Sequence, residues 1–551
     1  MPPILPSRHQ PQLPLDRLIL SDPPGAEALE MDVLFVGAGP AGLAGAIELA
    51  RLVKKSQEAG SGIPDLGIGV LEKAGSLGEH NLSGAVVNPR ALRELFPEMK
   101  DGDFPFRQAV TGESVHFLTQ GGSRRIPTPP TMHNEGFYTA SICEVVRWLG
   151  EQAESLGVNI FPGFPADALL VDGRAVRGVR TTVGGLDREG NPTGNYTEPT
   201  DITARVTVLT EGTRGTLGQA YREWQGIRSP NPQIFALGVK EVWQVKQPLD
   251  RVIHTLGWPL PSDAFGGSWI YPLGPEMISL GMVVGLDYRQ AGLDVHVMLQ
   301  RLKQHPLVRP LLEGGELLEW GAKTIPEGGY YALPDRRSGA GILMAGDTVG
   351  FVDVPSLKGV HYAMQTGMYA ARAAFDALQG GDPSAAALSA YDRMLNESYV
   401  VSDLHRTRNM RLAFKDGLVA GGIRAGLMAM TGGRFPGRQI VMHADAERIR
   451  EPSPADEFVP DGVLTFSKVD AVFKAGNATR DTIPQHLLVG EDVTGEVADF
   501  YAHLCPAGVY ERVGDELRVN APNCVDCKAT DILGPRWMPR EGGSGPKYRL
   551  M

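Results

Sequence analysis

The apolar residues near the start of the chain form short continuous runs. Residues 33–36 (VLFV) are one such run, and the glycine-rich segment 37–42 (GAGPAG) follows it directly. A short run that is rich in strand formers predicts a strand buried in a parallel sheet. Residues 43–55 have a helical composition, and after a Gly/Ser/Pro interruption at 60–67 the run 68–73 (IGVLEK) predicts the next strand. Strand, turn, helix and strand in this order predict a βαβ unit.

The rest of the chain alternates between similar strand signals and helical stretches. Apolar residues at helical spacing predict a helix over about 141–157, followed by a strand at 158–163. Two further strand-plus-glycine segments lie at 204–215 and 341–350. Residues 236–334 contain alternating and aromatic segments, which predict a mostly antiparallel sheet. The remaining predictions are helices over 357–380 and 383–430 and a linker over 451–462.

Composition and charge exclude several classes of protein. Of the 551 residues, 42% are hydrophobic and 21% are charged. These values are average for a soluble globular chain, and they exclude wholesale disorder, a collagen-like polymer and a small disulfide-stapled domain. The 53 basic and 64 acidic residues give a net charge of −11, which argues against a dedicated nucleic-acid binder. No uncharged apolar stretch approaches the ~20 residues that a membrane-spanning helix needs.

The first 30 residues are rich in proline and contain no hydrophobic signal core. They carry Asp16, Asp22, Glu27 and Glu30, which makes them unlike an Arg-rich, acid-poor transit peptide. We therefore expect a loosely ordered leader over residues 1–30, without a cleavable signal, on a protein that is not secreted.

A dinucleotide-binding fingerprint follows the first predicted strand. It consists of Gly37, Gly39 and Gly42, with Pro40 and Ala41 before the last glycine. The first glycine permits a tight turn, the second lets a pyrophosphate approach the backbone, and the third lets helix and strand pack closely. The pyrophosphate then lies at the helix N-terminus, where free N–H groups and the helix dipole favour negative charge. The alternative is an ordinary glycine-rich turn.

Glu72 and Lys73 end the second predicted strand. Glu72 is the candidate for binding the hydroxyls of an adenosine ribose, although it lies farther from the glycines than the usual ~20 residues because of the interruption at 60–67. An acidic residue here favours FAD or NAD over NADP, whose 2′-phosphate it would repel.

A later segment resembles the second FAD motif of the glutathione-reductase-like flavoproteins. In 341–350 (GILMAGDTVG), Gly346 and Asp347 follow a predicted strand, and in that family an Asp at this place holds the ribitol of the flavin. The stretch 208–212, with Glu211, is similar to their connecting strand. Asp347 could also serve as a helix N-cap. A helix that begins near Gly359 would direct its positive end toward the flavin pyrimidine.

The four cysteines are unevenly distributed. Cys143 stands alone among apolar residues of a predicted helix, and we interpret it as a core residue. Cys505, Cys524 and Cys527 cluster near the C-terminus, which indicates metal binding more than disulfide formation. The pattern Cys505-Pro506 with Cys524-x2-Cys527 is similar to a ferredoxin-type cluster motif, but Thr530 occupies the third place of the run.

The Thr530 hydroxyl is a poor, hard ligand for sulfide-bridged iron. Three interpretations therefore stay open. The tail could hold a cubane cluster, either complete with a non-Cys ligand (water, Thr530 or Asp531) or reduced to three irons. It could keep the fold and lack the cluster. The cysteines could instead bind zinc or only pack.

Taken together, the motifs resemble the electron-transfer flavoprotein:ubiquinone oxidoreductase family, over nearly the whole chain from about Asp32. The blocks that carry the resemblance include 82–92 (LSGAVVNPRAL), 129–138 (PPTMHNEGFY), 266–271 (GGSWIY), 354–367 (VPSLKGVHYAMQTG), 464–473 (LTFSKVDAVF), 505–511 (CPAGVYE), 523–528 (NCVDCK) and 539–546 (PREGGSGP).

The resemblance implies one FAD, one [4Fe–4S] cluster and a quinone pocket, on a protein that enters one membrane leaflet without spanning it. It implies that electrons pass from reduced electron-transfer flavoprotein to ubiquinone or menaquinone. It makes Gly266 and Gly267 the residues that contact the quinone, because a flat ring needs close approach to the backbone; a β-bulge or tight turn without a ligand is the alternative. The chain departs from this family pattern at Thr530, where the third cysteine of the run is expected.

The resemblance also implies the fold class, α/β plus α+β. We expect a glutathione-reductase-like FAD-binding domain, an inserted quinone domain with a mixed or antiparallel sheet, a helical region, and a C-terminal ferredoxin-like iron–sulfur domain. Their expected ranges are 31–110, 141–235 and 335–385 for the FAD domain, 111–140 and 236–334 for the quinone domain, 386–450 for the helical region and 463–551 for the iron–sulfur domain.

Two segments are candidates for contact with a membrane surface. Residues 409–433 contain Arg411, Lys415 and Arg424 among apolar residues, with Arg434 and Arg438 following, and such a helix could lie in the headgroup layer. The stretch 82–96 is the second candidate, and each could instead be a buried amphipathic face. We expect a monotopic protein of the bacterial inner (cytoplasmic) membrane. The alternatives are a flavin monooxygenase or prenyl reductase that uses NAD(P)H, and a cluster-less member that only docks electron-transfer flavoprotein.

Overall fold

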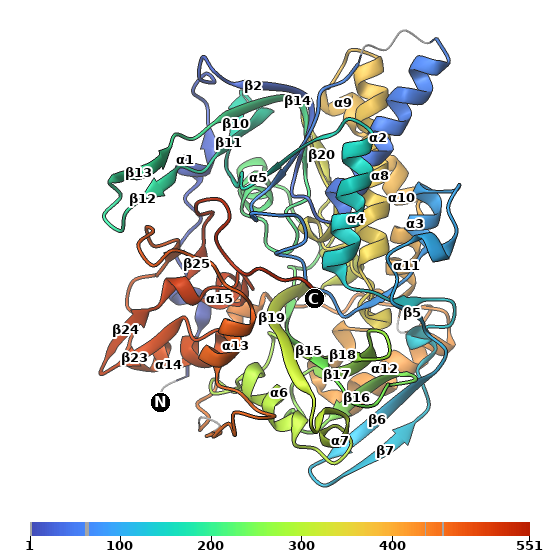
Figure 1. Ribbon diagram of the computed structural model, residues 1–551, viewed down its shortest axis with the longest axis vertical. Helices are drawn as coiled ribbons and strands as arrows, with labels where there is room; N and C mark the ends of the chain where they lie inside the picture. Colours follow the sequence, from blue (N-terminus) through green and yellow to red (C-terminus); the bar gives the residue numbers. More distant parts are fainter. Residues whose placement is uncertain (1–2, 61–64, 436, 455–456) are drawn as a thin grey trace.

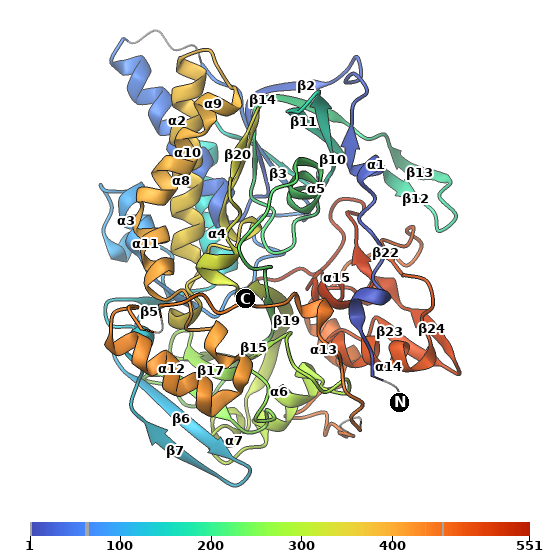
Figure 2. The same ribbon diagram turned by 180° about the vertical axis from the view of Figure 1, so that it is seen from behind.

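The computed structural model describes residues 3–60, 65–435, 437–454 and 457–551 (Figures 1 and 2). The predicted interruption at 60–67 and the predicted linker at 451–462 fall partly between these ranges, and those parts lie outside the described residues. Two larger sheets and a smaller C-terminal segment surround the centre of the molecule, where the C-terminus lies in both views.

The first sheet confirms the predicted βαβ unit. β2 (Leu29–Val36) and β3 (Ile68–Glu72) are parallel neighbours, with Val36 opposite Leu71, and α2 (Pro40–Glu58) connects them. Every residue of β3 is buried, as a parallel strand covered on both faces requires. In spatial order the sheet contains β1 (Ile19–Leu20), β10 (Ala166–Asp172), β11 (Ala175–Thr181), β14 (Asp201–Leu209), β2, β3 and β9 (Asn159–Pro162), with β20 (Ser338–Gly339) and β21 (Ile342–Met344) attached through β14.

Long helices cover this sheet. α8 (Val360–Gln379) packs closely on α2, because a Cβ at Gly367 would stand only 2.0 Å from the Ala41 carbonyl oxygen. α4 (Ile142–Ser155) begins where the Ser141 side chain accepts a hydrogen bond from the Glu144 N–H. Figure 1 shows α2, α4 and α8 side by side in the upper part of the molecule.

The second sheet joins segments that are far apart in the sequence. Its strands, in spatial order, are β19 (Glu316–Pro326), β15 (Phe235–Gln244), β18 (Met277–Gly285), β17 (Gly266–Pro272), β16 (Val252–Gly257), β6 (Glu113–Thr119) and β7 (Gly122–Ile126). All neighbours are antiparallel except β16 and β6. The mostly antiparallel sheet predicted for 236–334 is therefore present, and it is extended by the earlier hairpin of β6 and β7.

The C-terminal segment is built from short elements: α13 (Lys468–Lys474), β22 (Leu487–Leu488), α14 (Gly495–Leu504), β23 (Tyr510–Val513), β24 (Glu516–Val519), α15 (Ala529–Leu533) and β25 (Arg536–Trp537). Its apolar side chains share one hydrophobic core with the second sheet, including Trp243 and Phe500. The chain then returns to α4, where the Ser141 hydroxyl donates to the Met551 carbonyl oxygen at 3.0 Å.

The expectation of a loosely ordered leader is wrong for residues 3–20, whereas residues 21–27 are exposed and form no helix or strand. β1 pairs with β10, and Leu18 is completely buried in the first core. Ile4 is buried as well and pairs with Arg450 through both backbone groups. The few apolar residues between the prolines pack against the rest of the protein and hold this segment in place. Proline content alone does not predict these contacts.

The predicted helix over 383–430 is divided into short helices: α9 (Ala385–Leu388), α10 (Ala390–Glu397), α11 (Tyr399–Arg406) and α12 (Leu418–Met430). Ser398 causes one of these divisions, because its side chain accepts from the Val401 N–H and starts α11. Among the described residues, no helix combines the length and hydropathy that crossing a bilayer would require.

Candidate functional site

A cavity of about 350 Å³ lies where the first sheet, the second sheet and the C-terminal segment meet. Its walls come from the ends of β2, β3 and β14, the first turn of α8, strands β15, β17, β18 and β19, and residues after β25. The carboxyl ends of parallel strands are the usual place for a ligand in an α/β sheet.

The three fingerprint glycines have different surroundings in the structure. Gly37 has φ +112°, and a Cβ there would stand 2.5 Å from the Thr210 carbonyl oxygen. A Cβ at Gly42 would stand 2.0 Å from the Gly37 carbonyl oxygen, so both glycines are required by the protein's own packing. Gly39, the N-cap of α2, has no protein atom closer than 3.6 Å to such a Cβ, and it lines the cavity with Pro40 and Ala41. The open side of this loop is therefore available to a ligand.

Glu72 lies at the end of β3 in the cavity wall. Its carboxylate accepts from the Ala74 N–H at 2.8 Å and from the Ala38 N–H at 3.3 Å, so it also holds the glycine loop. Burial raises the pKa of this carboxyl, and the two backbone donors oppose the shift. The neighbouring Lys73 lines the cavity too, but its ammonium pairs with Asp526 of the C-terminal segment.

Asp347 lies in the short 3₁₀ turn η5 (Gly346–Thr348) and faces the same cavity. Its alternative role as a helix N-cap is not found, because Ala345 occupies that position of η5. Burial raises the pKa of Asp347 to about 6. Gly346 (φ +63°) does not line the cavity; its N–H donates to the Thr366 hydroxyl behind the turn. Glu211 reaches the cavity wall, but its carboxylate accepts from the Leu217 and Gly218 N–H groups at the start of α5 (Thr216–Gln225).

Positively charged groups and a helix N-terminus also line the cavity. α8 begins at Val360 with Gly359 as its N-cap, and both residues line the cavity, as predicted for a helix directed at the ligand. Lys323 on β19 adds an ammonium group that was not predicted from the sequence. Burial lowers the pKa of Lys323 to about 8. The sequence feature that could have identified Lys323 is the presence of a lysine among the apolar residues of a strand.

Gly266 and Gly267 lie on β17, and neither lines the cavity. A Cβ at Gly266 would stand 2.3 Å from the Val283 carbonyl oxygen, and one at Gly267 would stand 2.5 Å from the Thr255 carbonyl oxygen. Both glycines thus permit close strand packing. The pairing of β17 with β18 contains no bulge.

Trp269 and Tyr271, farther along β17, do line the cavity. The Tyr271 hydroxyl is hydrogen-bonded to His254 Nε2 at 2.5 Å. Burial raises the pKa of Tyr271, and burial lowers the pKa of His254 to about 3. The pair is therefore uncharged and retains the phenolic proton at neutral pH.

A second cavity, of about 20 Å³, lies inside the C-terminal segment. Cys505, Cys524 and Cys527 line it together with Thr530, and all four residues are buried. Burial raises the pKa of each thiol, that of Cys524 to about 12, so thiolates would form here only when paired with a cation such as a metal. Cys143 lies elsewhere, buried in α4, and its prediction as a core residue is confirmed.

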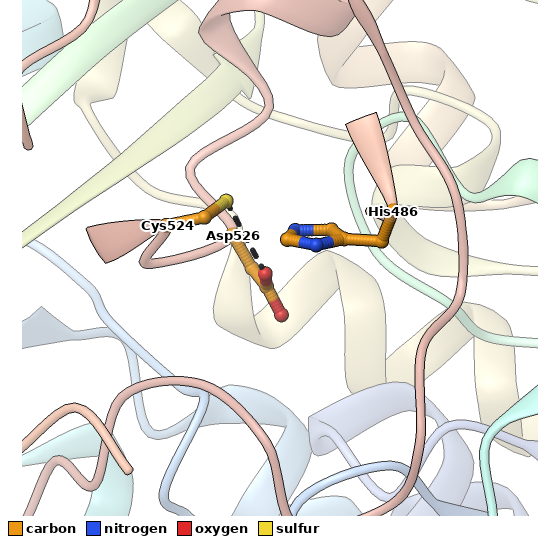
Figure 3. Close-up of side chains that lie close together, drawn as sticks. All are labelled: His486, Cys524 and Asp526. Atoms are coloured by element: carbon orange, nitrogen blue, oxygen red, sulfur yellow. Dashed lines mark hydrogen bonds between the residues drawn. The ribbon is translucent and has the colours of Figure 1, made fainter. Parts of the chain in front are cut away.

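His486, Cys524 and Asp526 also lie close together (Figure 3). The Arg540 guanidinium already contacts this group, because it donates to His486 Nε2 at 3.0 Å and to Asp526 Oδ1 at 2.9 Å. Although burial alone raises the pKa of Asp526, Arg540 and Lys73 lower it well below its usual range. A cation is thus already present, and this triad does not fit a separate metal site.

Lys528 and Trp537 line both cavities. The Lys528 ammonium lies over the Trp537 ring, 3.2 Å from its centroid. The Trp537 indole N–H donates to Asp526 at 2.8 Å. The large cavity and the cysteine cavity therefore share part of their lining.

Comparison with known proteins identifies the family. The family model described as "ETF-QO, ubiquinone-binding" matches residues 235–325, and the one described as "Electron transfer flavoprotein-ubiquinone oxidoreductase, 4Fe-4S" matches residues 462–549. The mitochondrial electron transfer flavoprotein-ubiquinone oxidoreductase of Dictyostelium discoideum is 40% identical, over 96% of this chain and 92% of that protein. The chain belongs to the electron transfer flavoprotein-ubiquinone oxidoreductase family.

Other members of the family are similar over the same length. The Pseudomonas aeruginosa electron transfer flavoprotein-ubiquinone oxidoreductase is 37% identical, over 95% of this chain and 100% of that protein. The human mitochondrial protein is 35% identical, over 95% of this chain and 90% of that protein. The resemblance inferred from the sequence is thus confirmed.

The similarity to solved structures is evidence about the fold and not about the function. A geranylgeranyl bacteriochlorophyll reductase-like protein from Thermoplasma acidophilum gives a TM-score of 0.56 at 19% identity, over 75% of this chain and 93% of that chain. The flavin-dependent brominase Bmp2 gives a TM-score of 0.51 at 16% identity, over 74% of this chain and 94% of that chain. The expected FAD-binding fold agrees with both.

Proposed function

We propose that this member of the family oxidises reduced electron-transfer flavoprotein and reduces a membrane quinone, ubiquinone or menaquinone, with FAD and an iron–sulfur cluster as cofactors. Family membership along the whole chain supports this activity over the monooxygenase, prenyl reductase and docking alternatives. The structural observation that carries the proposal is the shared wall of Lys528 and Trp537, with the dinucleotide fingerprint on one side and three thiols on the other. Two electron carriers in these cavities would be close neighbours.

The large cavity fits FAD. Its glycine loop is open at Gly39 and closed by protein at Gly37 and Gly42, so the pyrophosphate would lie at the start of α2. Glu72 would bind the ribose hydroxyls, and Asp347 would bind the ribitol. When bound, FAD supplies electron transfer in either one-electron or two-electron steps, which suits a flavoprotein donor and a quinone acceptor.

The surroundings of the flavin ring would favour negative charge on it. The N-terminus of α8 at Gly359 carries the positive end of the helix dipole. Lys323 and Lys358 also line the cavity, and burial lowers the pKa of each to about 8. These groups would stabilise an electron-rich flavin ring without any contribution from a general acid.

The apolar part of the cavity suits a quinone ring. Leu82, Trp269 and Leu357 contribute apolar surface there. The Tyr271 hydroxyl, held by His254, would donate a hydrogen bond to a quinone oxygen. Gly266 and Gly267 stay predicted quinone contacts; they lie on the same strand as Trp269 and Tyr271 but outside the cavity wall.

We also propose that α12 attaches the protein to one leaflet of the bacterial inner membrane. Val419, Ile423 and Met430 are 77%, 63% and 78% exposed, and such apolar side chains on one helix suit the headgroup layer. The alternative segment 82–96 is less suited, because Leu92 and Leu95 of α3 (Arg90–Leu95) are buried in the first core.

The experiment that tests the function uses the purified full chain with bound FAD, reduced electron-transfer flavoprotein and a soluble ubiquinone analogue. We expect quinone reduction that depends on electron-transfer flavoprotein. Rapid bleaching of the flavin by NADH or NADPH alone would favour the monooxygenase or prenyl reductase. A lack of quinone reduction at full FAD occupancy would leave only a docking role.

A further inference from the structure

Thr530 lies where the third cysteine of the run would otherwise lie. It is the second residue of α15 and lines the small cavity with the three cysteines. The chain reaches it through two residues with left-handed backbone, Asp526 (φ 56°) and Lys528 (φ 69°). This turn brings Cys524, Cys527 and position 530 to one cavity, so the backbone provides a fourth ligand position and only the side chain differs.

The Thr530 side chain cannot replace a thiolate. Its hydroxyl is neutral and hard, whereas sulfide-bridged iron prefers soft, anionic sulfur. The hydroxyl is also engaged already, because it shares a hydrogen bond with the Tyr510 hydroxyl at 3.3 Å. Tyr510 is itself buried, and its hydroxyl is engaged by Thr530 in this same bond.

The nearby carboxylates are hydrogen-bonded to other groups, although Asp526 Oδ1 lies 3.7 Å from Cys524 Sγ. One carboxylate oxygen of Asp531 accepts a hydrogen bond from Arg214 Nε at 2.8 Å. The other oxygen accepts from the Trp537 backbone N–H at 3.1 Å. Asp526 accepts from Trp537, Arg540 and Lys73. Among the residues that the structure describes around this cavity, neither carboxylate belongs to its lining. Both are therefore occupied by cations or N–H donors, and neither replaces the missing cysteine.

We infer that this chain binds a three-iron cluster through Cys505, Cys524 and Cys527, and that the corner beside Thr530 holds no protein-bound iron. Three thiolates can bind three irons, one iron each. The thiolate that would bind a fourth iron is missing at position 530. The inference rests on the proposed function only for the class of cofactor, an iron–sulfur cluster. It adds that this member of the family departs from the four-iron type that the matched family description names.

Metal and sulfide analysis tests the inference independently of activity. The full chain with FAD is purified without oxygen, and iron, zinc and acid-labile sulfide are measured per FAD. Electron paramagnetic resonance spectra are recorded before and after dithionite reduction. We expect about three irons per FAD and a cluster signal in the oxidised state that reduction removes.

Substitutions at Thr530 provide the matched controls. Thr530→Cys restores the third thiolate, so we expect about four irons per FAD and a signal that appears only after reduction. Thr530→Val and Thr530→Ser should both keep the three-iron signature, because neither supplies a thiolate. If Thr530→Cys fails to fold, as judged by its FAD content, the wild-type and Thr530→Val spectra still decide.

Several outcomes would overturn the inference. One is about four irons per FAD in the wild type, with a signal only after reduction. Loss of the wild-type signature in Thr530→Val would show that the hydroxyl is itself a ligand. Zinc or no metal in the wild type would also overturn it. Failure of the proposed function is distinguishable, because it would abolish quinone reduction and leave the iron count unchanged.

Discussion

The Thr324 backbone N–H donates a hydrogen bond to the Cys527 carbonyl oxygen at 3.0 Å. Thr324 lies on β19 and lines the large cavity, whereas Cys527 lines the small one. The neighbouring Lys323 ammonium reaches the Asp526 carbonyl oxygen at 3.3 Å. These two hydrogen bonds, one from a backbone N–H and one from a side chain, connect the wall of the large cavity to the cysteine loop, and they limit relative movement of the two proposed cofactors.

Asp526 lies in the cysteine loop, and its carboxylate is buried. Removing the negative charge of this carboxylate should destabilise the protein. The carboxylate oxygens are shared by Arg540, Lys73 and the Trp537 indole. Asp526→Asn would leave the buried Arg540 guanidinium without its counter-ion, so we expect the free energy of unfolding to fall by about 3 kcal/mol in urea denaturation. The exposed substitution Asp250→Asn is the control and should leave the unfolding midpoint unchanged. A fall smaller than about 1 kcal/mol for Asp526→Asn would contradict the assigned role.

Asp347 should make the stability of the flavin-free protein depend on pH. Burial raises the pKa of Asp347 to about 6 from an ordinary value of 3.8. Between these pH values the folded protein binds this proton and the unfolded chain does not, so the contribution of Asp347 to stability increases as the pH falls. Asp347→Asn should therefore be more stable than wild type by about 2–3 kcal/mol at pH 7, and the difference should vanish near pH 4.

Urea denaturation of both proteins at a series of pH values measures this difference. FAD binding supplies a second readout, because the substitution removes the proposed ribitol ligand. We expect Asp347→Asn to bind FAD at least about tenfold more weakly, equivalent to about 1.4 kcal/mol. A stability difference that stays constant with pH would argue against an ionised Asp347 whose pKa is raised in the folded protein.

Substitution of Gly267 and of Gly84 by alanine should have different effects. The first should affect packing and stability, and the second should affect binding of the quinone analogue. A Cβ at Gly267 would stand 2.5 Å from the Thr255 carbonyl oxygen, so Gly267→Ala should lower the free energy of unfolding by about 1–3 kcal/mol. Gly84 lines the cavity, and a Cβ there would contact only Tyr271, at 3.9 Å. Gly84→Ala should keep its stability and change the KM for the quinone analogue. If Gly267→Ala keeps full stability and loses only quinone affinity, the glycine contacts the ligand.

The exposed apolar face of α12 should determine binding to vesicles. The double variant Val419→Asp/Ile423→Asp places two charges where 77% and 63% of those residues are exposed. We expect binding to anionic phospholipid vesicles to weaken at least about tenfold in a sedimentation assay, with unchanged thermal stability. Val513→Asp, at the exposed hairpin of β23, is the control. Equal vesicle binding by all three proteins would exclude α12 as the attachment site.

The sequence alone determined the parts of this protein that depend on short spacing. The fingerprint from Gly37 to Gly42 and the run from Cys524 to Thr530 each lie within a few residues, so the backbone turn that brings them together is local. The family resemblance followed from many such blocks in one order. The flavoprotein fold and the lack of a third cysteine in the run therefore follow from the order of residues along the chain.

Only the tertiary structure decided what surrounds these motifs. Lys323 comes from β19, whereas Lys528 and Trp537 come from the C-terminal segment. The association of Asp526 with Arg540 and Lys73 requires the C-terminal segment to pack beside β3 and β19. The burial of Leu18 from the N-terminal segment and the ion pair of Asp531 with Arg214 also depend on contacts between distant segments. Contacts between distant segments form because whole apolar faces are buried together, and their partners have no fixed spacing along the chain.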